Sequence, residues 1–589
     1  MKHTTSILKL FSLALLLVTG AACTDNFDKI NRKDYQVDKE ELGREGYNVG
    51  ASLKGLQGLV IPTEEHLYQF IEPLAAGAFA GYFSTTTEWT AKFETYNPPI
   101  DWQEAPFSDI MTRTYPFYRD LLQETEDPVA LALGKLLRII IMHRVTDMYG
   151  PIPYSKVISK TGDASLTVPY DSQEDVYKQM LKELDEVVAT LKDNLSLSAE
   201  AYRKYDDVYQ GDLSKWLKFT NSLKLRMAMR MTYVPEMQAE VQRIAEEAVT
   251  SGVLTANTDN AFLKVEENRP AMIFNDWNDS RIGADIISYM NGYKDPRREK
   301  MFTTVDVYDE YWNLVKGWVG IRIGIDATNK DYIITALSNY MTTKTDPIMW
   351  MNAAEITFLR AEGALRGWNM GGEAKDLYNQ AIALSFEQWG VTEANTYAAN
   401  TTDMPLIYTD ALYYMYDDTA GPRSTITIAW ENGAENFERN LERIITQKWI
   451  ANFPLGVESW SEFRRTGYPR LIPVVENKSG GIIDTNHMIR RLWYPPTEYT
   501  ENADNINLAI GLLGGPDNGG TRLWWDKKRK EVETIRTLPP ISLNAAPEPK
   551  KKHAPTARYT SQQYWMYHCI LAYEELFQPF FVTFFFRFN

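Results

Sequence analysis

The chain has 589 residues, 44% of them hydrophobic and 24% charged, which is typical of a folded globular protein and not of a disordered or fibrous one. A formal net charge of −16, from 62 Lys+Arg against 78 Asp+Glu, argues against a nucleic-acid-binding protein, because such a protein needs a basic face. Only 2 cysteines and 6 scattered histidines are present, without CxxC or HExxH spacing, so we expect no disulfide framework, no metal site and no cofactor.

Residues 1–22 have the features of a targeting segment. Two lysines precede an apolar run from Leu10 to Val18, which is too short for a permanent membrane helix. Three small residues, 20–22, then lead directly into Cys23. This order resembles the bacterial lipoprotein signal, which implies acylation of Cys23 and a membrane anchor there. Ordinary secretion with an incidental cysteine is the alternative.

The residue composition changes twice in the segment that follows Cys23. Residues 23–50 are polar and charge-mixed, as expected of a lipidated tether, and a helical pattern follows from Ala51 to Ile61. Residues 82–118 are rich in aromatics, Thr, Asn and Pro without a sustained period, which predicts long irregular loops. No later segment reaches the roughly 18 apolar residues of a membrane span.

Three helices are then predicted in the middle of the chain. The first runs from Pro128 to Met148, with proline near its first position and nearly continuous apolar residues. The second begins at Ser172, where Asp175 three residues on makes an acidic variant of the capping box. The third covers Leu213 to about Val234, and we expect its Trp216 to lie in the core.

The stretch from Trp350 to Trp389 predicts two antiparallel helices. Small residues on the first helix allow close approach, residues 369–372 make the turn, and Tyr378 and Ile382 on the second fill the groove to the next pair. This residue pattern is typical of a tetratricopeptide unit, which needs neighbouring helix pairs to bury its other face. A helical hairpin inside an irregular α-domain is the alternative.

The C-terminal third is richer in turns and predicts a helix followed by extended segments. Residues 529–589 form an atypical tail with three consecutive lysines and a Phe-dense end. Such an apolar cluster should be buried or bind a partner. A gene-model artefact and a partner-binding appendage both remain open for it.

Seven phrases in one order resemble the SusD/RagB family of Bacteroidetes surface lipoproteins, over nearly the whole chain from Cys23 to about Lys528. The phrases are RVTDMYGPIPYSKV (144–157), PYDSQEDVYKQMLKELD (169–185), GDLSKWLKFTNSLKLRMAMR (211–230), DPIMWMNAAEITFLRAEGALRGWN (346–369), ESWSEFRRTGYPRLIP (458–473), RRLWYPPTEYTENADNINLAI (490–510) and RLWWDK (522–527). Acidic residues just after Cys23, at Asp25 and Asp28, resemble the surface-export signal of such lipoproteins.

The resemblance implies an all-α fold of tetratricopeptide-like helix pairs, with long irregular loops and minor β structure, over residues 51–528. It also implies a lipid-anchored protein of the outer membrane at the cell surface. Such a protein captures an oligosaccharide or other nutrient, as the lid of a SusC-like TonB-dependent outer-membrane barrel that imports the ligand.

Sugar rings present apolar C–H faces and a rim of hydroxyls, so a glycan site needs aromatic platforms beside hydrogen-bonding groups. Two loop regions combine these residue types. The candidate ligand-binding residues are Trp89, Tyr96 and Trp102 in the first region, and Trp277, Asn278 and Arg281 in the second. Trp312 and the group Tyr413, Tyr414 and Tyr416 are further options.

Other family hallmarks are interpreted as architecture. The paired Arg464 and Arg465 are expected to neutralise carboxylates or bind helix C-terminal carbonyls, and Trp350 is expected to be core. No carboxylate spacing, nucleophile elbow or phosphate loop singles out a catalytic site, so we expect no enzyme. A surface glycoside hydrolase and a helical-repeat scaffold without ligand are the alternative hypotheses.

Overall fold

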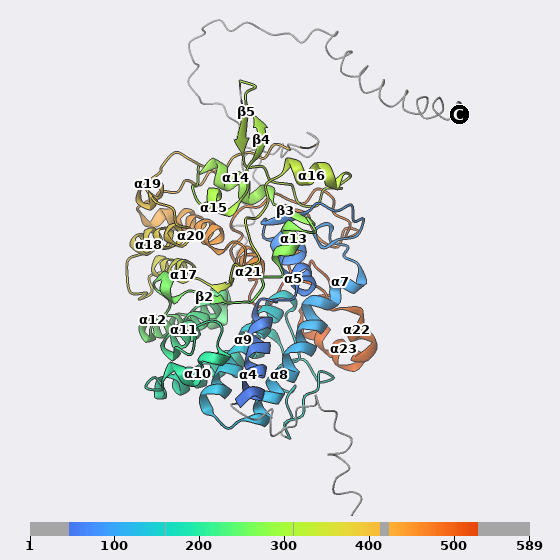
Figure 1. The fold of residues 1–589 in the computed structure, drawn as a ribbon, viewed down its shortest axis with the longest axis vertical. Helices are drawn as coiled ribbons and strands as arrows, with labels where there is room; N and C mark the ends of the chain where they lie inside the picture. Colours follow the sequence, from blue (N-terminus) through green and yellow to red (C-terminus); the bar gives the residue numbers. More distant parts are fainter. Residues whose placement is uncertain (1–45, 160, 310, 411, 413–422, 528–589) are drawn as a thin grey trace, which may run out of the picture. The chain divides into compact units, whose positions relative to one another are not determined.

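The computed structural model describes residues 46–527, except 160, 310, 411 and 413–422. Within this range the chain is mainly helical and carries three two-stranded antiparallel sheets (Figure 1). The predicted all-α class with irregular loops and minor β structure is therefore confirmed. The predicted signal peptide, Cys23 and the tail after 528 lie outside the described residues.

The longer helices are α4 (Tyr47–Val60), α8 (Ile110–Glu124), α9 (Pro128–Tyr149), α10 (Gln173–Asp193), α11 (Leu213–Arg230), α12 (Gln238–Ser251), α14 (Ala284–Gly292), α17 (Ala353–Leu365), α18 (Ala374–Gln388), α20 (Phe437–Asn452), α21 (Gly456–Thr466) and α23 (Ala503–Leu512). The shorter helices are α5 (Glu65–Ile71), α6 (Gly77–Phe79), α7 (Ile100–Glu104), α13 (Ala271–Asn275), α15 (Arg298–Met301), α16 (Lys330–Ala336), α19 (Ala394–Ala398) and α22 (Pro496–Glu501). The strands are β1 (Phe83–Thr85), β2 (Ala261–Leu263), β3 (Ser280–Ile282), β4 (Val305–Tyr308), β5 (Leu314–Gly317) and β6 (Ile348–Met351), paired β1–β3, β2–β6 and β4–β5.

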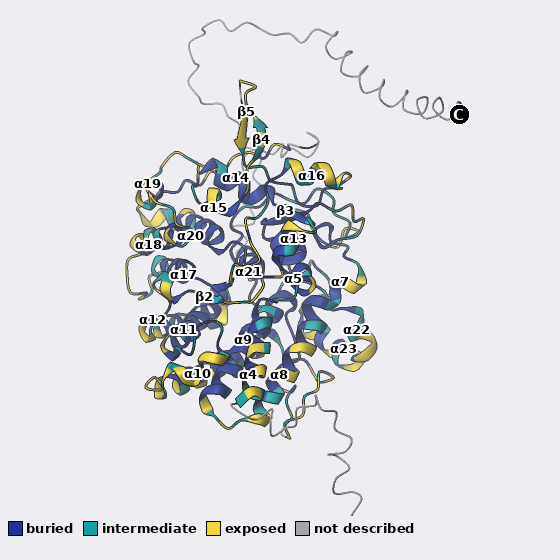
Figure 2. Cartoon of the chain, viewed as in Figure 1, coloured by how far each residue is buried: buried dark blue, intermediate teal, exposed yellow. Residues whose placement is uncertain are grey.

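Successive helices pack on one another from α9 to α20. Helix α9 contacts α10, α10 contacts α11, α11 contacts both α12 and α17, and α17 contacts α18 and α20 (Figure 1). Their contact faces are buried, whereas exposed residues are confined to the outer faces (Figure 2). This is the stacking that a helix pair needs to bury both of its faces.

The helix pair expected between Trp350 and Trp389 is confirmed as α17 and α18. A Cβ at Gly363 would lie 2.7 Å from Met370 Cγ, so the small residue permits the close turn between the helices. The hydroxyl of Tyr378 donates to Ile428 O at 2.7 Å, and its ring lies 5.6 Å from that of Trp430. Tyr378 thus fills the groove to the following segment, as predicted.

The caps of two other helices also follow the sequence. Asp127 accepts from Val129 N at 3.0 Å ahead of Pro128 in α9, and Ser172 accepts from Asp175 N at 3.1 Å at the start of α10. A Cβ at Gly134 would lie 2.0 Å from a side-chain carbon of Leu121, so glycine lets α8 and α9 touch.

Four boundary predictions were wrong. Helix α11 ends at Arg230 instead of Val234, because Pro235 restricts Val234 to the extended backbone that it adopts. Residues 100–118, expected as loop, are helical in α7, a π-helical turn and α8. Tyr and Thr occupy several of the buried positions of α8, so a search for apolar residues alone did not detect its helical period. Residues 47–50 were expected to belong to the tether but form the first turn of α4. Trp350 is buried as predicted, but it lies in strand β6 and not in a helix.

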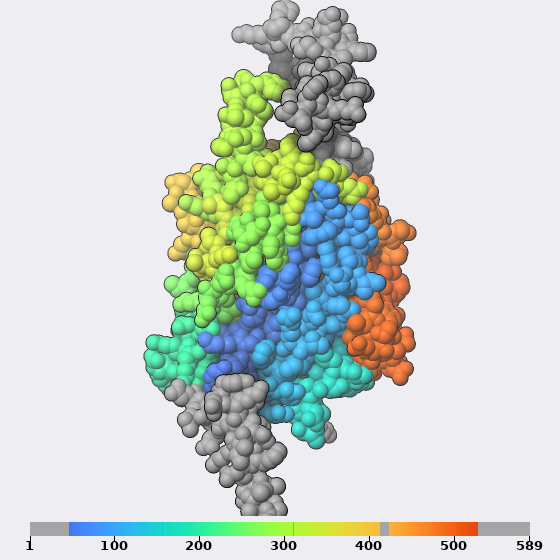
Figure 3. Space-filling model, turned by 45° about the vertical axis from the view of Figure 1, so that its right-hand side comes forward, coloured from blue at the N-terminus to red at the C-terminus, as the bar shows by residue number. Residues whose placement is uncertain are grey.

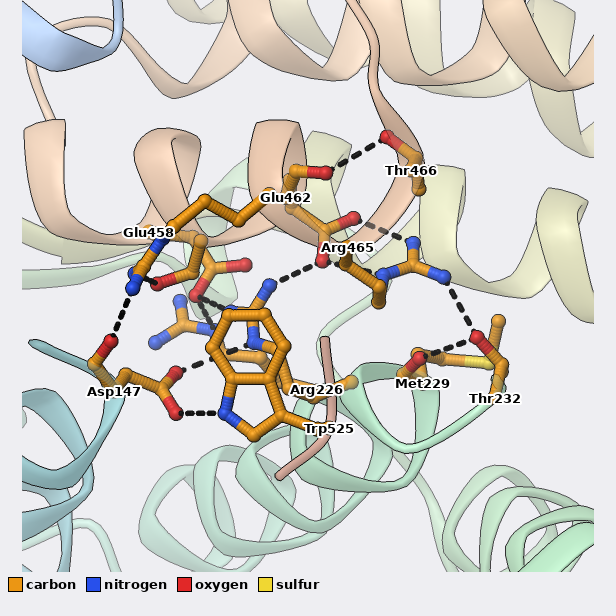
Figure 4. Close-up of polar contacts among 12 residues, drawn as sticks. Asp147, Arg226, Met229, Thr232, Glu458, Glu462, Arg465, Thr466 and Trp525 are labelled. Atoms are coloured by element: carbon orange, nitrogen blue, oxygen red, sulfur yellow. Dashed lines mark hydrogen bonds and ion pairs between the residues drawn. The ribbon is translucent and has the colours of Figure 1, made fainter. Parts of the chain in front are cut away.

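A network of buried ion pairs joins helices α11 and α17 to helix α21 (Figure 4). Arg465 on α21 binds Glu362 on α17 and Glu462, while Arg464 donates to the carbonyls of Asp147 and Arg490 at 2.7 and 3.0 Å. The structural role predicted for the two arginines is confirmed. Further charged members of the network include Arg226, Arg230, Glu355, Lys448 and Glu458.

Candidate functional site

Two loops that are distant in sequence are joined by a short sheet. Strand β1 pairs with β3 so that Phe83 lies opposite Ile282 and Thr85 opposite Ser280. The pairing continues beyond the strands, since Thr87 Oγ1 donates to Asp279 Oδ1 at 3.0 Å across 192 residues of chain. The two regions with the candidate ligand-binding aromatics therefore lie side by side, blue beside green in Figure 3.

Helix α5 connects the aromatic rings of both loops. Its His66 stacks on Trp277, with ring centroids 4.9 Å apart, and its Phe70 packs on Trp102 at 5.3 Å. These two residues are four positions apart and share one face of the helix. Gln69, between them in sequence, donates to Asp279 Oδ2 at 2.9 Å and fixes the helix to the second loop.

The arrangement continues to Trp89, whose ring meets that of Trp102 edge to face at 4.8 Å. We call Trp277, His66, Phe70, Trp102 and Trp89 the aromatic strip. His66 is exposed, Trp89, Phe70 and Trp277 are half-buried, and Trp102 is only 8% exposed. Ring edges and faces at the two ends of the strip are accordingly accessible, while its middle is embedded in the fold.

Tyr96 and Arg281 lie deeper than a direct ligand contact requires, whereas Asn278 is half-buried like Trp277. Tyr96 is 3% exposed and packs near Phe79, and burial raises the pKa of its hydroxyl. Arg281 is 4% exposed and donates to Asn278 Oδ1 at 2.8 Å and to Ser280 O at 3.0 Å. Burial lowers the pKa of Arg281 to about 10. Both polar side chains thus hold the shape of the loop that carries Trp277.

Acidic groups near the strip already have structural partners. Asp279 accepts from Gln69 and Thr87 and forms an ion pair with Lys330 at 2.6 Å. In the described part of the chain, Glu64, Glu65 and His66 bring potential metal-ligand atoms within 4.8 Å of one another. Yet Glu64 caps α5 by accepting from Leu67 N at 2.7 Å, and Glu65 pairs with an arginine, so the cluster is explained without a cation.

A second aromatic surface lies on the β4–β5 hairpin, where Tyr308 pairs with Leu314. The hairpin projects beyond the body beside α14 and α16 (Figures 1 and 3). Tyr308, Tyr311 and Trp312 are 66%, 76% and 76% exposed. Sequence reasoning named Trp312 as an option and missed the other two, although the alternation of residues 305–308 is a strand signal. Tyr413, Tyr414 and Tyr416 lie outside the described residues.

Among the described helices, none combines the length and the apolarity that a bilayer crossing requires. Stacked helix pairs with irregular loops that carry an aromatic strip define a helical-repeat binding protein. A family model described as SusD-like, Susd and RagB outer membrane lipoprotein, matches residues 29–526. The chain belongs to this family.

Solved structures agree with the assignment. A SusD homologue of Bacteroides thetaiotaomicron is 52% identical, with a TM-score of 0.78, over 82% of this chain and 100% of that one. A homologue from Bacteroides ovatus is 42% identical, with a TM-score of 0.76, over 82% and 99%. A chitin-binding SusD homologue from Flavobacterium johnsoniae is 36% identical, with a TM-score of 0.73, over 81% and 98%. Comparison with curated proteins gave no match. The family and these homologues support a surface glycan-binding lipoprotein and do not favour an enzyme.

Proposed function

We propose that this protein captures a glycan on the aromatic strip at the outer-membrane surface and delivers it to a SusC-like TonB-dependent barrel for import. The observation that carries the proposal is the placement of His66 and Phe70 on one face of α5, each against a tryptophan of a different loop. The family description as an outer-membrane lipoprotein supports the location.

The chemistry of the strip suits a sugar chain. Indole rings stack on the C–H faces of pyranose rings, and hydroxyls at the ring edge need donors and acceptors. Glu88 and Thr90 flank Trp89, and Asn275 and Asp276 precede Trp277; all four are exposed. Each accessible tryptophan therefore stands beside polar side chains that can bind hydroxyls.

The candidate residues receive different roles in this proposal. Trp89 and Trp277 contact the ligand, and Trp102 supports both the Trp89 ring and Phe70 from behind. Tyr96, Asn278 and Arg281 order the loops. Cys23, once acylated, holds the protein to the membrane, and a hydrocarbon chain contributes about 0.8 kcal/mol per buried CH₂ to that anchor.

Affinity electrophoresis against a panel of polysaccharides, with chitin oligosaccharides as competitors, tests the glycan step. We expect retardation by at least one polysaccharide, with loss of most retardation in Trp89→Ala and Trp277→Ala. Tyr47→Ala is the control, because Tyr47 is an exposed aromatic, 60% exposed, on α4 and outside the aromatic strip. Unchanged retardation in both tryptophan variants contradicts the assignment of the site, and shortened products on incubation favour the hydrolase alternative.

Affinity purification of the intact lipoprotein from outer membranes tests the transport step. Co-purification of a TonB-dependent barrel is the expected result. The cells are grown on the polysaccharide that retards the protein. Recovery of the lipoprotein alone in mild detergent contradicts the partnership with a barrel.

A further inference from the structure

A cavity of about 420 Å³ lies behind α5, on the side away from the aromatic strip. Tyr68 and Glu72 line it, whereas His66 and Phe70 of the strip lie on the other face of the same helical segment. Its volume is in the range of small-molecule sites, about 300–1,000 Å³.

The cavity has a rigid aromatic wall. Phe274 and Tyr340 meet edge to face with centroids 5.4 Å apart, and Tyr340 meets Phe453 in the same way at 5.0 Å. Segments that are far apart in sequence contribute the rest of the lining, which is mostly apolar. The remaining apolar lining residues include Phe262, Ala271, Met341, Ile348, Met349, Trp389 and Leu455.

The two carboxylates of the lining already have partners. Both carboxylate oxygens of Glu72 are engaged, one by Arg144 and the other by Gly456 N at 2.9 Å. Asp346 accepts from Thr343 N at 2.7 Å. Tyr68, by contrast, is only 6% exposed, and in the described part of the chain its hydroxyl makes no hydrogen bond. Burial raises the pKa of Tyr68 well above its ordinary value, so this hydroxyl stays protonated at neutral pH.

The mostly apolar lining with its aromatic wall favours an aromatic occupant over a sugar. A saturated sugar ring carries several hydroxyls, and those left unpaired in an apolar cavity cost free energy. An aromatic ring packs edge to face against Phe274, Tyr340 and Phe453 without that cost. A single hydroxyl on such a ring can exchange a hydrogen bond with the hydroxyl of Tyr68, which is unpaired among the described residues.

We propose that this cavity binds a small, uncharged aromatic compound whose hydroxyl group hydrogen-bonds to Tyr68. The site is separate from the aromatic strip and does not depend on glycan binding there.

Isothermal titration calorimetry of the mature protein with 2-naphthol tests the proposal. We expect saturable binding to one site. Ala271→Phe, which fills the cavity from α13, should abolish it. Tyr68→Phe, which keeps the ring and removes only the hydroxyl, should weaken binding about 2- to 10-fold, the worth of one neutral hydrogen bond.

The controls separate the alternatives. Trp277→Ala on the strip should leave 2-naphthol binding unchanged, and methyl glucoside should neither bind to the cavity nor compete with 2-naphthol. The proposal is overturned by absence of saturable 2-naphthol binding, by wild-type affinity in Tyr68→Phe, or by competition from methyl glucoside. If Ala271→Phe fails to fold, as circular dichroism would show, Tyr68→Phe alone decides, because its lost hydroxyl has no partner in the described structure.

Discussion

Arg465 and Glu362 form a two-pronged ion pair inside the protein, with Nη1 2.8 Å from Oε1 and Nη2 2.6 Å from Oε2, and both side chains 0% exposed. The pair joins α21 to the first helix of the α17–α18 unit. Burial alone would raise the pKa of Glu362, but Arg465 and Arg366 outweigh it and hold the pKa below its ordinary value. The carboxylate therefore stays ionised, and the pair depends on both of its charges.

Removing one partner should destabilise the protein strongly. Arg465→Met leaves Glu362 and Glu462 without their main counter-charge, so we expect a loss of about 3–5 kcal/mol in the free energy of unfolding. Urea denaturation followed by circular dichroism measures it. Arg243→Met is the matched control, because Arg243 pairs with Glu247 where both side chains are 53% exposed, and should cost at most about 0.5 kcal/mol. Equal effects of the two substitutions would refute the special role of the buried pair.

His143 should make the stability of the protein fall in mild acid. Burial lowers the pKa of His143 to about 4 from 6.5, and nearby Asp147 offsets only part of this effect. Between these values the unfolded chain binds a proton that the folded chain does not. The contribution of His143 is therefore complete above pH 6.5 and decreases as the pH falls, by about 2 kcal/mol at pH 5.

Urea denaturation at pH 7 and pH 5 checks this dependence. In His143→Gln the loss between the two pH values should be smaller than in the wild type by that amount. His487→Gln, at a histidine whose side chain is 44% exposed, should keep the wild-type loss. An unchanged loss in His143→Gln would mean that other groups cause the acid sensitivity.

Two tryptophans should differ sharply in their effect on stability. Trp460 on α21 is 0% exposed, donates to Ile489 O at 3.3 Å and lies under Arg464. Trp460→Ala should cost about 3–5 kcal/mol, as expected for deletion of a large core side chain. Trp312→Ala, on the projecting hairpin, should change stability by less than about 0.5 kcal/mol. Thermal unfolding compares them, and a large loss in Trp312→Ala would show that the hairpin packs against the body.

Membrane attachment should depend on one residue near the N-terminus. Cys23→Ser removes the thiol that acylation requires, so we expect the protein to move from the detergent phase to the aqueous phase in detergent partitioning. Metabolic labelling with a radioactive fatty acid should label the wild type and not the variant. Cys569→Ser, at the second cysteine, is the control and should retain the label. Fatty-acid labelling of Cys23→Ser would contradict anchoring at this position.

Much of the helical framework could be predicted from local signals. Pro128 after Asp127 and Ser172 before Asp175 mark helix starts that depend only on neighbouring residues. The small residues of α17 likewise act within one helix pair, and Tyr378 of α18 belongs to the same repeat pattern although it packs on Trp430 outside the pair. The role of Arg464 and Arg465 was predicted from the ability of guanidinium groups to bind carboxylates and carbonyls, but their partners Glu362, Asp147 and Arg490 could not be read from spacing.

The site was predicted less completely, for a physical reason. The residue types in the two loops pointed to Trp89, Trp102 and Trp277, but exposure depends on packing by segments elsewhere in the chain. Tyr96 and Arg281 are buried by such contacts. His66 and Phe70 were missed because α5 is short and their partners, Trp277 and Trp102, come from loops that only the β1–β3 pairing brings together.

The three-residue pairing of β1 with β3 has a consequence for how such proteins diversify. Backbone hydrogen bonds, which any side chain tolerates, set the spacing between the Trp89 and Trp277 loops. Exchange of a few outward-facing side chains could then retune which polymer is recognised while the supporting framework keeps its geometry. In the proposed site, this short backbone pairing would allow ligand selectivity to change while the scaffold is retained.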